Sequence, residues 1–414
     1  MGYLSFLRVN WRWLLAAFLL AFSSSYGQTF FISLFAGQIR DEFGLSHGAW
    51  GGIYSLATTA SALLMVWAGG LTDRFRVRRI GPVVLVALAI ACLAMAAVPS
   101  AAALVAVIFA LRFTGQGMTS HIAMVGVARW FVATRGRAMA IAALGFAAGN
   151  AVMPILFVAL MSVFSWRSLW VLAAGMAVIF VPILLILLDK ERTPQSISKS
   201  DSAPGMNGEH WKRHEMLRHW LFWLMLPTFI GPAAWGTAMF FQQVHLTEVK
   251  GWSLTAFVAL FPLFTLTNIA TSFATGWAID RFGSGRVMSF YAVPYILTFV
   301  VMATANDLAT ASVAMMVFGI ATGMGQALPG AFMAEHYGTR YIGSIKALST
   351  ALMVFGSAIG PGITGWLIDR GIMFPDQMFG IAAYFAVAGV MVLVGTTRAR
   401  ALLSGATQVN VERA

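Results

Sequence analysis

The sequence has very few cysteines and very few charged residues for its length. Only one of its 414 residues is a cysteine, Cys92, and it lies in an apolar stretch. A single cysteine excludes a disulfide framework and a thiolate metal cluster, and a free cysteine in such a place usually serves packing. Charged residues make up 10% of the chain and hydrophobic residues 59%. A soluble domain of this length could not bury so much apolar surface, so the composition indicates a membrane protein.

Several motifs of enzymes and pumps are also missing. The sequence contains no Gly-x-x-x-x-Gly-Lys-Ser/Thr run, so ATP-driven pumping is not expected. It has no His-Glu-x-x-His pattern or cysteine pair for a metal, and no Gly-x-Ser-x-Gly turn for a nucleophilic serine. We therefore expect no enzyme activity, no cofactor and no metal.

Long apolar runs dominate what is present. A membrane-spanning helix needs about 20 mostly apolar residues. Twelve segments meet this requirement, at approximately residues 13–38, 48–72, 79–98, 101–128, 137–163, 167–189, 218–244, 252–279, 286–305, 307–333, 342–369 and 376–398. The first follows Arg8 and Arg12 and is longer than a signal-peptide core, so we expect it to be retained.

A serine- and glycine-rich stretch with mixed charges separates the sixth and seventh of these runs. Its composition predicts a flexible linker. The predicted fold is therefore an all-α polytopic membrane protein with 12 transmembrane helices in two halves. The predicted organisation is a first half at 1–189, a linker at 190–217, a second half at 218–398 and a tail at 399–414.

The basic residues predict the orientation, because positively charged loops stay on the cytoplasmic side. If the N-terminus is inside, the outer loops hold only Arg40, Arg167, Lys250 and Arg370 of the 27 basic residues. Both termini and the linker are then cytoplasmic, and we expect a multi-pass protein of the bacterial inner membrane. Anionic lipid headgroups account for the net charge of +12, so no nucleic-acid partner is expected.

One short phrase occurs twice, at residues 69–79 and 276–286. Its two aspartates, Asp73 and Asp280, lie 280 − 73 = 207 residues apart, half the length of the chain, which indicates a duplicated unit. Each copy lies where an apolar run meets a basic turn. An aspartate there can accept backbone hydrogen bonds or pair with an arginine and so hold two helices together. The residues predicted to gate conformational change are Asp73, Arg74, Arg78, Asp280, Arg281 and Arg286.

The repeated phrase resembles the signature loop of the major facilitator superfamily, which joins the second and third helices of each half. The first copy has Arg76 where the family usually has glycine, whereas the second keeps Gly283. The run Arg-Phe-Thr-Gly-Gln-Gly at 112–117 is similar to the family's fourth-helix motif, and residues 145–154 resemble its fifth-helix Gly-Pro motif. The resemblance implies two pseudo-symmetric six-helix bundles that rock around a midplane site by alternating access.

A weaker resemblance points to a branch of that superfamily. Residues 129–140, which begin Arg-Trp-Phe, resemble the inner loop of the monocarboxylate and oxalate/formate branches. Those branches typically carry a cationic residue in the eighth helix, and residues 252–279 contain none.

Arg112 is the only charge predicted near the bilayer centre, since every acidic residue falls in a loop or near a helix end. A buried arginine costs about 2.5 to 3.5 kcal/mol on insertion scales, so it should be paired or functional. An anionic substrate is one partner, and hydrogen bonds to neighbouring helices are the alternative. His121, on the same helix, either titrates during transport, which would make it a proton-coupling residue, or is a hydrogen-bonded interior histidine.

Polar and aromatic side chains on the first, fourth, seventh and tenth helices are the other site candidates, because the resemblance implies that these helices line the cavity. Together with the arginine, the predicted substrate-binding residues are Tyr26, Gln28, Arg112, Gln116, Trp235, Thr237, Gln242 and Gln326. The alternative for the polar ones is hydrogen bonding between packed helices.

These observations favour a secondary transporter of a small organic anion, such as a mono- or dicarboxylate, working as a proton symporter or an exchanger. An exporter of amphipathic compounds, such as drugs or siderophores, is a second hypothesis, and a transporter-like membrane sensor is a third. The expected partners are a small, anionic substrate and the lipid bilayer, with the protein functional as a monomer.

Overall fold

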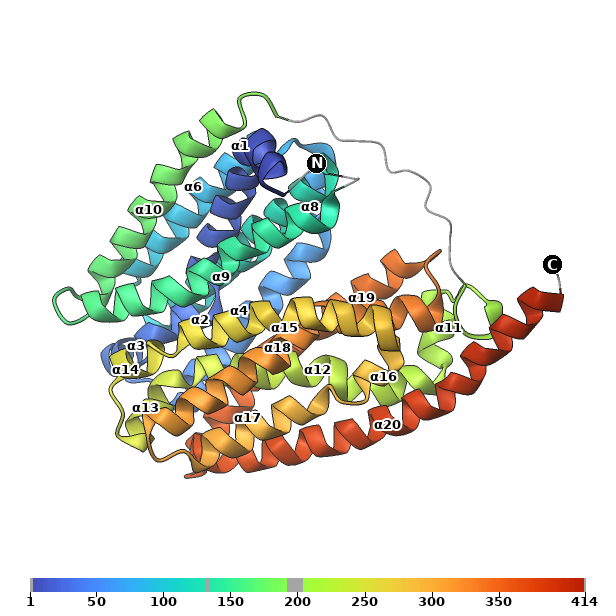
Figure 1. Cartoon of the computed structure of the whole chain (residues 1–414). Helices are drawn as coiled ribbons and strands as arrows, with labels where there is room; N and C mark the ends of the chain where they lie inside the picture. Colours follow the sequence, from blue (N-terminus) through green and yellow to red (C-terminus); the bar gives the residue numbers. More distant parts are fainter. Residues whose placement is uncertain (1–2, 132–133, 192–203, 413–414) are drawn as a thin grey trace. The chain divides into compact units, whose positions relative to one another are not determined.

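The computed structural model describes residues 3–131, 134–191 and 204–412, and this part of the chain is helical without a β-strand (Figure 1). The helices up to residue 191 are α1 (Tyr3–Ser23), η1 (Ser24–Gly27), α2 (Thr29–Ile32), η2 (Ser33–Phe35), α3 (Ala36–Phe43), α4 (His47–Ala68), α5 (Leu71–Arg74), α6 (Val77–Ala96), α7 (Ala101–Leu111), η3 (Arg112–Thr119), α8 (Ser120–Trp130), α9 (Arg135–Leu160) and α10 (Trp166–Leu187). The helices after residue 203 are η4 (Met206–Gly208), α11 (Arg213–Arg218), α12 (Trp220–Phe241), α13 (Gln243–Lys250), α14 (Leu254–Val258), α15 (Phe261–Phe282), α16 (Ser284–Met288), α17 (Ala292–Thr304), α18 (Leu308–Tyr337), α19 (Ile342–Ile368) and α20 (Phe374–Glu412).

Twelve helical stretches of the described residues are long and apolar enough to cross a membrane, which confirms the all-α polytopic prediction. The main difference from the predicted boundaries concerns the first span, which covers Ser5–Gly27 instead of 13–38. Near its beginning, Arg12 Nη2 donates to the carbonyl of Ile186, at the end of α10, at 3.2 Å. It ends earlier because the helix breaks after Ser23.

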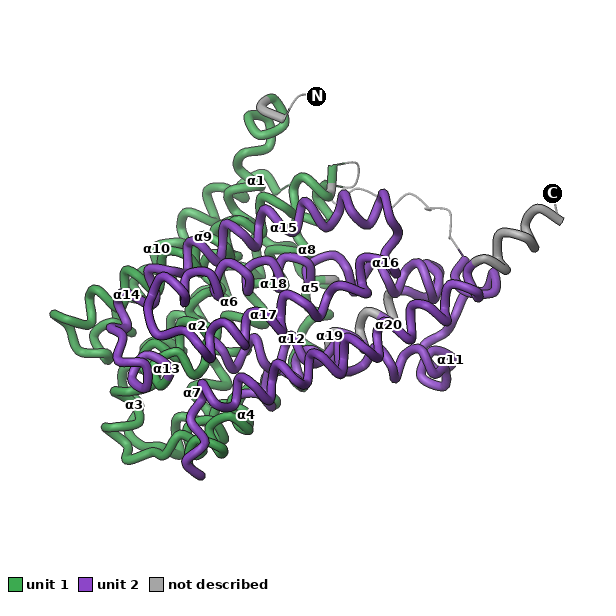
Figure 2. The backbone as a smooth tube through the Cα atoms, turned by 60° about the horizontal axis from the view of Figure 1, so that its bottom comes forward, with its two compact units in different colours: residues 1–198, 240–245, 361–369 green, residues 199–239, 246–360, 370–414 purple. Residues whose placement is uncertain are grey.

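The chain forms two compact units, coloured separately in Figure 2. Unit 1 consists of Met1–Ser198, Phe240–His245 and Pro361–Asp369, and unit 2 consists of Lys199–Met239, Leu246–Gly360 and Arg370–Ala414. Two short segments from the later part of the sequence therefore belong to unit 1. The division into halves at residues 189 and 218 stays a prediction.

Small residues bring the helices of unit 1 close together, as the glycine and alanine content favours. Helix α6 packs along α10, and α1 packs along α9 (Figure 1). At Gly145 of α9 an added Cβ would lie 2.2 Å from the carbonyl oxygen of Phe18 in α1, so no larger residue fits there.

Small residues also bring the helices of unit 2 close together. Its helix α15 packs along α18, and α17 packs along α20. An added Cβ at Gly319 of α18 would lie 2.4 Å from the carbonyl oxygen of Phe264 in α15. One step further along the same interface, Asn268 Nδ2 donates to Thr322 Oγ1 at 2.7 Å, so a polar side chain in an apolar span is satisfied between helices.

Both ends of the predicted linker are packed, which differs from the expectation of a flexible stretch over 190–217. At its start, the carbonyl of Lys190 accepts a hydrogen bond from Trp13 Nε1 at 3.0 Å. Near its end, the Trp211 N–H donates to the carbonyl of Tyr337 at 3.0 Å, and the two rings contact at 5.9 Å. A tryptophan indole buries enough apolar surface to anchor a short segment. Residues 192–203 of the linker lie outside the described part of the chain.

Candidate functional site

The first membrane-spanning helix ends in a break that lies within the long apolar run at residues 13–38. Helix α1 stops at Ser23, a 3₁₀ turn follows over Ser24–Gly27, and Gln28 is extended with φ −85° and ψ 152°. Two serine hydroxyls donate to backbone carbonyls of the preceding turn, Ser23 Oγ to Leu19 O at 2.8 Å and Ser24 Oγ to Ala21 O at 2.6 Å, and such local bonds compete with a regular helix. Because irregular backbone within a bilayer is tolerated only inside protein or beside a water-filled cavity, the break marks a special place in unit 1.

A second irregular segment lies directly opposite the break. Residues Arg112–Thr119 form the π-helix η3, and such segments are frequent at functional sites. The two backbones touch through glycines. A Cβ on Gly27 would lie 2.2 Å from Leu111 O, and one on Gly115 would lie 2.7 Å from Gly27 Cα.

Arg112 reaches from the start of this π-helix to the break. Its side chain is 2% exposed, and its Nη1 donates to Gly27 O at 3.0 Å and to Thr29 Oγ1 at 3.4 Å. Its guanidinium carbon lies 5.2 Å from the ring centroid of Tyr54, a cation–π contact. No ion pair between described residues involves Arg112, and its buried Nε has no hydrogen-bond partner. The site therefore holds a buried positive charge whose Nε–H has no hydrogen-bond partner among the described residues.

Tyr54 connects the arginine to one of the two later segments of unit 1. Its hydroxyl lies 2.5 Å from Thr29 Oγ1, and its ring packs on Phe241 with centroids 4.8 Å apart. Trp50, one turn earlier on α4, stacks on the same phenylalanine at 5.8 Å. Tyr54 is not among the predicted site residues, although a tyrosine in an otherwise apolar run is a signal that could have identified it.

A glutamine and a serine join the same later segment to the broken helix. Ser33 Oγ donates to Phe240 O at 2.7 Å. Gln243 Nε2 lies 3.0 Å from Phe30 O and 2.7 Å from Ser33 Oγ, and donates to both. The segment after the break is thus hydrogen-bonded, through Phe30 and Ser33, to residues 240–243.

The predicted substrate-binding residues of unit 1 have different surroundings. Tyr26 is fully buried, and its hydroxyl has no partner. Gln28 is 8% exposed, and Gln116 is half-buried within the π-helix. Gln242 is already committed, because its Nε2 donates to Thr364 Oγ1 at 2.9 Å.

The three remaining predicted residues belong to unit 2. The Nε1 of Trp235 is buried without a partner, and its ring lies 5.7 Å from that of Tyr384. Thr237 is half-buried and Gln326 is exposed. That these residues act together with those of unit 1 stays a prediction.

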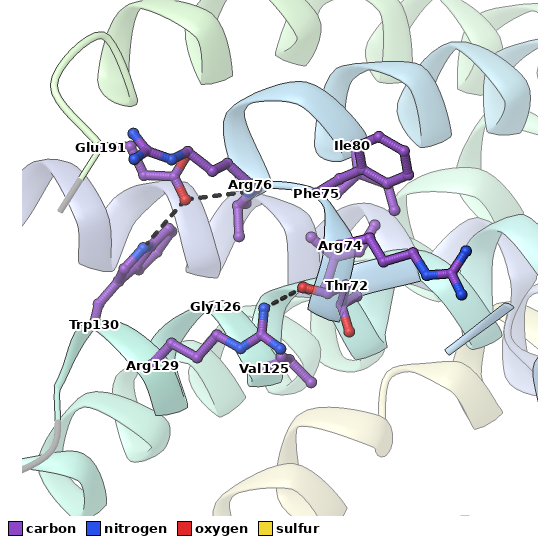
Figure 3. A pocket seen from close by; sticks show the side chains of 12 residues that line it. Thr72, Arg74, Phe75, Arg76, Ile80, Val125, Gly126, Arg129, Trp130 and Glu191 are labelled. Atoms are coloured by element: carbon purple, nitrogen blue, oxygen red, sulfur yellow. Dashed lines mark hydrogen bonds between the residues drawn. The ribbon is translucent and has the colours of Figure 1, made fainter. Parts of the chain in front are cut away.

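The first copy of the repeated phrase lines a small cavity of about 120 Å³ in unit 1 (Figure 3). Arg74 and Arg76 contribute to its wall, and Arg129 donates to the carbonyl of Thr72 across it. Glu191 closes one side. One carboxylate oxygen accepts from the Val77 N–H at 3.1 Å and from Trp130 Nε1 at 3.4 Å, and the other accepts from the Arg78 N–H at 3.2 Å.

The other predicted gating residues of this copy are placed as follows. Arg78 pairs with Asp189 at 3.1 Å, both partly exposed, whereas the side chain of Asp73 lies outside the described part of the structure. His121 Nε2 lies 3.2 Å from Gly69 O and 3.4 Å from Thr72 Oγ1, so the histidine contacts the phrase itself. A role of His121 in proton coupling stays a prediction.

The second copy has the same capping arrangement with a different carboxylate. Glu335 of α18 accepts from the N–H of Ser284 at 2.9 Å and also from its hydroxyl. Gly283 has φ +82°, which favours glycine, while Arg76 at the equivalent place has φ −70°, which suits any residue. The arginine in the first copy therefore strains no turn. Asp280, Arg281 and Arg286 are exposed.

Comparison with known proteins agrees with this architecture. A family model described as Major Facilitator Superfamily matches residues 17–361 and 233–408. The chain belongs to that superfamily. Two of its solved structural neighbours are transporters. A bacterial homolog of the human lysosomal transporter Spinster, in an inward-facing and occupied conformation, matches with TM-score 0.65, 17% identity, and coverage of 95% of this chain and 96% of that one. The nucleoside transporter NupG matches with TM-score 0.68, 14% identity, and coverage of 94% and 99%.

Curated relatives of this superfamily member match over a shorter stretch. A protein named multidrug resistance protein B homolog, from Mycobacterium tuberculosis, is 29% identical over 144 residues, which is 34% of this chain and 25% of that protein. The same match occurs in a second strain of that organism. The chain thus spans about a quarter of the length of the curated relatives it matches. The superfamily match, the solved neighbours and the twelve apolar helices show a multi-pass membrane protein with the fold of that superfamily.

Proposed function

We propose that this transporter carries a small organic anion of the mono- or dicarboxylate kind, as a proton symporter or an anion exchanger. The observation that carries the proposal is Arg112. It is a buried guanidinium without a carboxylate partner among the described residues, and its Nε is unpartnered beside a broken helix.

The chemistry of the guanidinium supports an anion. Its planar fork matches a carboxylate, and hydrogen bonds between charged groups are about twice as strong as neutral ones. A carboxylate bound there would neutralise a charge that is otherwise costly to bury. Tyr26 adds a second unpartnered donor in the same unit, and Gln28 is the extended residue at the break. We assign the recognition of the anion to these three residues.

We further propose that both termini face the cytoplasm of a bacterial cell, that the protein lies in the inner membrane, and that it works as a monomer. Support for the orientation comes from the distribution of basic residues, which leaves only four in the loops that would face outward. The repeated phrase, with Asp73 and Asp280, would then gate the cytoplasmic side.

An exporter of amphipathic compounds is the second candidate. One observation favours it, the similarity of about a third of the chain to multidrug resistance protein B homologs. In that case apolar walls would dominate recognition, and the arginine would serve only to hold the broken helix. The two candidates therefore differ in what they require of Arg112.

Counterflow of radiolabelled mono- and dicarboxylates in proteoliposomes tests the proposal. We expect exchange by the unmodified protein, a loss of roughly 10- to 150-fold in Arg112→Gln, since a charge-assisted hydrogen bond contributes about 1.5 to 3 kcal/mol, and an intermediate rate in Arg112→Lys. Arg8→Gln, a change at an exposed arginine, is the matched control and should leave the rate unchanged.

Two outcomes contradict the organic anion. One is unchanged carboxylate exchange in a folded Arg112→Gln protein, as judged by size-exclusion chromatography. The other is no carboxylate exchange together with dye efflux that is insensitive to Arg112→Gln, which supports the exporter instead. A thermal shift on adding the carboxylate, present in the unmodified protein and absent in Arg112→Gln, separates lost binding from slowed movement.

A further inference from the structure

Two segments from later in the sequence close one end of unit 1. This end is the one at the start of α4, away from the repeated phrase. Helix α4 runs from His47 to Ala68, directly before the phrase, so its first turn lies at the opposite end. Phe240–His245 and Pro361–Asp369 both pack there within unit 1. Both segments come from the second half of the sequence, which makes this packing a junction that alternating access would have to open.

Backbone contacts close one side of this junction. A Cβ on Gly51 would lie 2.4 Å from Pro361 O, and a Cβ on Gly365 would lie 2.3 Å from His47 O, so the first turns of α4 and the end of α19 meet without intervening side chains. Asp369 then caps α4: its Oδ2 accepts from Ser46 Oγ at 2.7 Å and from the Gly48 N–H at 2.9 Å. The contact is tight and leaves no room for rearrangement while it is closed.

Two histidines contact each other at this junction. The rings of His47 and His245 are in edge-to-face contact with centroids 4.5 Å apart, and His245 is 6% exposed. Arg40 of α3 is a cation close to both rings, and its Nε is buried without a partner. Asp369 lies beside His47, and its carboxylate already accepts two hydrogen bonds.

We propose that His47 and His245 form a proton-binding site that keeps this junction closed while both rings are neutral and releases it when a ring takes up a proton. A proton on either ring would face the partner ring and the Arg40 guanidinium in a poorly hydrated place. Separation of the two later segments exposes both rings to water, where the charge is solvated. The negative charge of Asp369 stabilises a proton on His47, but only in part, because its Oδ2 also accepts hydrogen bonds from Ser46 and Gly48.

The direction and size of the pH effect follow from linkage. Burial, and then Arg40, lower the pKa of His245 to about 4, against about 6.5 for a solvated histidine. The closed junction is therefore fully stable above about pH 6.5 and loses stability as the pH falls toward 4. Between pH 7.5 and pH 5 the ratio of open to closed protein should rise about 30-fold from His245 alone.

Distances between spin labels test the proton site without a transport assay. The chain's single cysteine is fully buried, so Cys92→Ala supplies a background for labelling. Labels at Gln38→Cys in α3 and Ile363→Cys in α19, both exposed positions of unit 1, report on the junction. Labels at Gln38→Cys and Ser162→Cys report on a part of unit 1 that does not open. We expect the first pair to gain a longer distance at pH 5 and the second pair to remain unchanged.

The histidine variants decide the matter. In the double variant His47→Gln and His245→Gln, the pH-dependent population of the first pair should disappear, while each single variant should retain part of it. Loss of the pH effect with retained folding supports the site. A pH effect that persists in the double variant, or is absent from the parent, overturns it.

The use of this site in transport depends on the proposed function, whereas the site itself does not. If the junction opens at pH 5 but no carboxylate is exchanged, the proposed proton site is supported and the proposed organic-anion substrate is contradicted. If carboxylates are exchanged and the label distances do not depend on pH, the proposed proton site is contradicted and the proposed substrate class is supported.

Discussion

Gly27 shows how strongly a single residue constrains this molecule. It lies at the break in the first span, where its backbone carbonyl accepts from Arg112 and its Cα touches Gly115. Sequence reasoning found the arginine, because a charge in an apolar run is conspicuous. It did not find the contact with Gly27, since nothing in the local sequence distinguishes a glycine that meets another backbone from one that faces lipid.

Gly27→Ala should destabilise the protein by about 1 to 3 kcal/mol, because the added methyl group would overlap Leu111 O and the backbones would have to separate. Thermal unfolding in detergent measures the effect. Gly52→Ala is the control: nothing lies within 4 Å of its added Cβ, and an alanine within a helix should be neutral or stabilising by up to about 1 kcal/mol. Equal melting temperatures for the two variants would contradict the close approach.

At the scale of the helical element, hydropathy predicts which segments cross the membrane but not where they become irregular. All twelve spans were predictable because about 20 apolar residues in succession have few alternatives. The 3₁₀ turn at Ser24–Gly27 and the π-helix at Arg112–Thr119 were not predicted. The same serine and glycine residues are compatible with a straight helix, and only the contact between the two spans selects the irregular form.

The carboxylate of Glu191, which follows the sixth span in the sequence, caps the first turn of helix α6. Because Glu191 satisfies two free backbone N–H groups of that first turn and also an indole N–H, Glu191→Ala should lower the stability of unit 1 by about 1 to 2 kcal/mol. Hydrogen exchange of peptides covering the first turn of α6 should speed up. Glu209→Ala, at an exposed glutamate, should leave that exchange unchanged, and faster exchange in both variants would show that the effect is not local.

At the scale of the whole molecule, the repeated phrase remains the clearest sign of duplication and of movement. The prediction that its aspartates hold a gate could be made because the phrase recurs 207 residues apart at equivalent helix ends. Its ion pairs could not be predicted residue by residue. Arg78 pairs with Asp189, outside the phrase, and Asp280 and Arg281 are exposed in unit 2.

Asp280→Ala should change the balance between conformations while leaving substrate preference nearly unchanged. The expected result is a change of several-fold in the initial rate of exchange, since a coupling free energy of 1 to 3 kcal/mol corresponds to roughly 5- to 150-fold. Competition between two labelled substrates should give the same ratio as in the unmodified protein. Asp41→Ala, at another exposed aspartate, serves as the control, and an altered competition ratio in Asp280→Ala would assign the residue to recognition instead.

The carboxylates that cap the two copies of the phrase come from non-equivalent positions of the two halves. Val77 and Ser284 occupy the same place in the repeat, yet Glu191 caps one and Glu335 caps the other. The repeat counterparts of these glutamates, 207 residues away, are Arg398 and Ala128, and no residue adjacent to either is acidic. The two halves therefore cap the same helix turn with acids from different places in the repeat, so tolerance to mutation measured in one half cannot be transferred to the other.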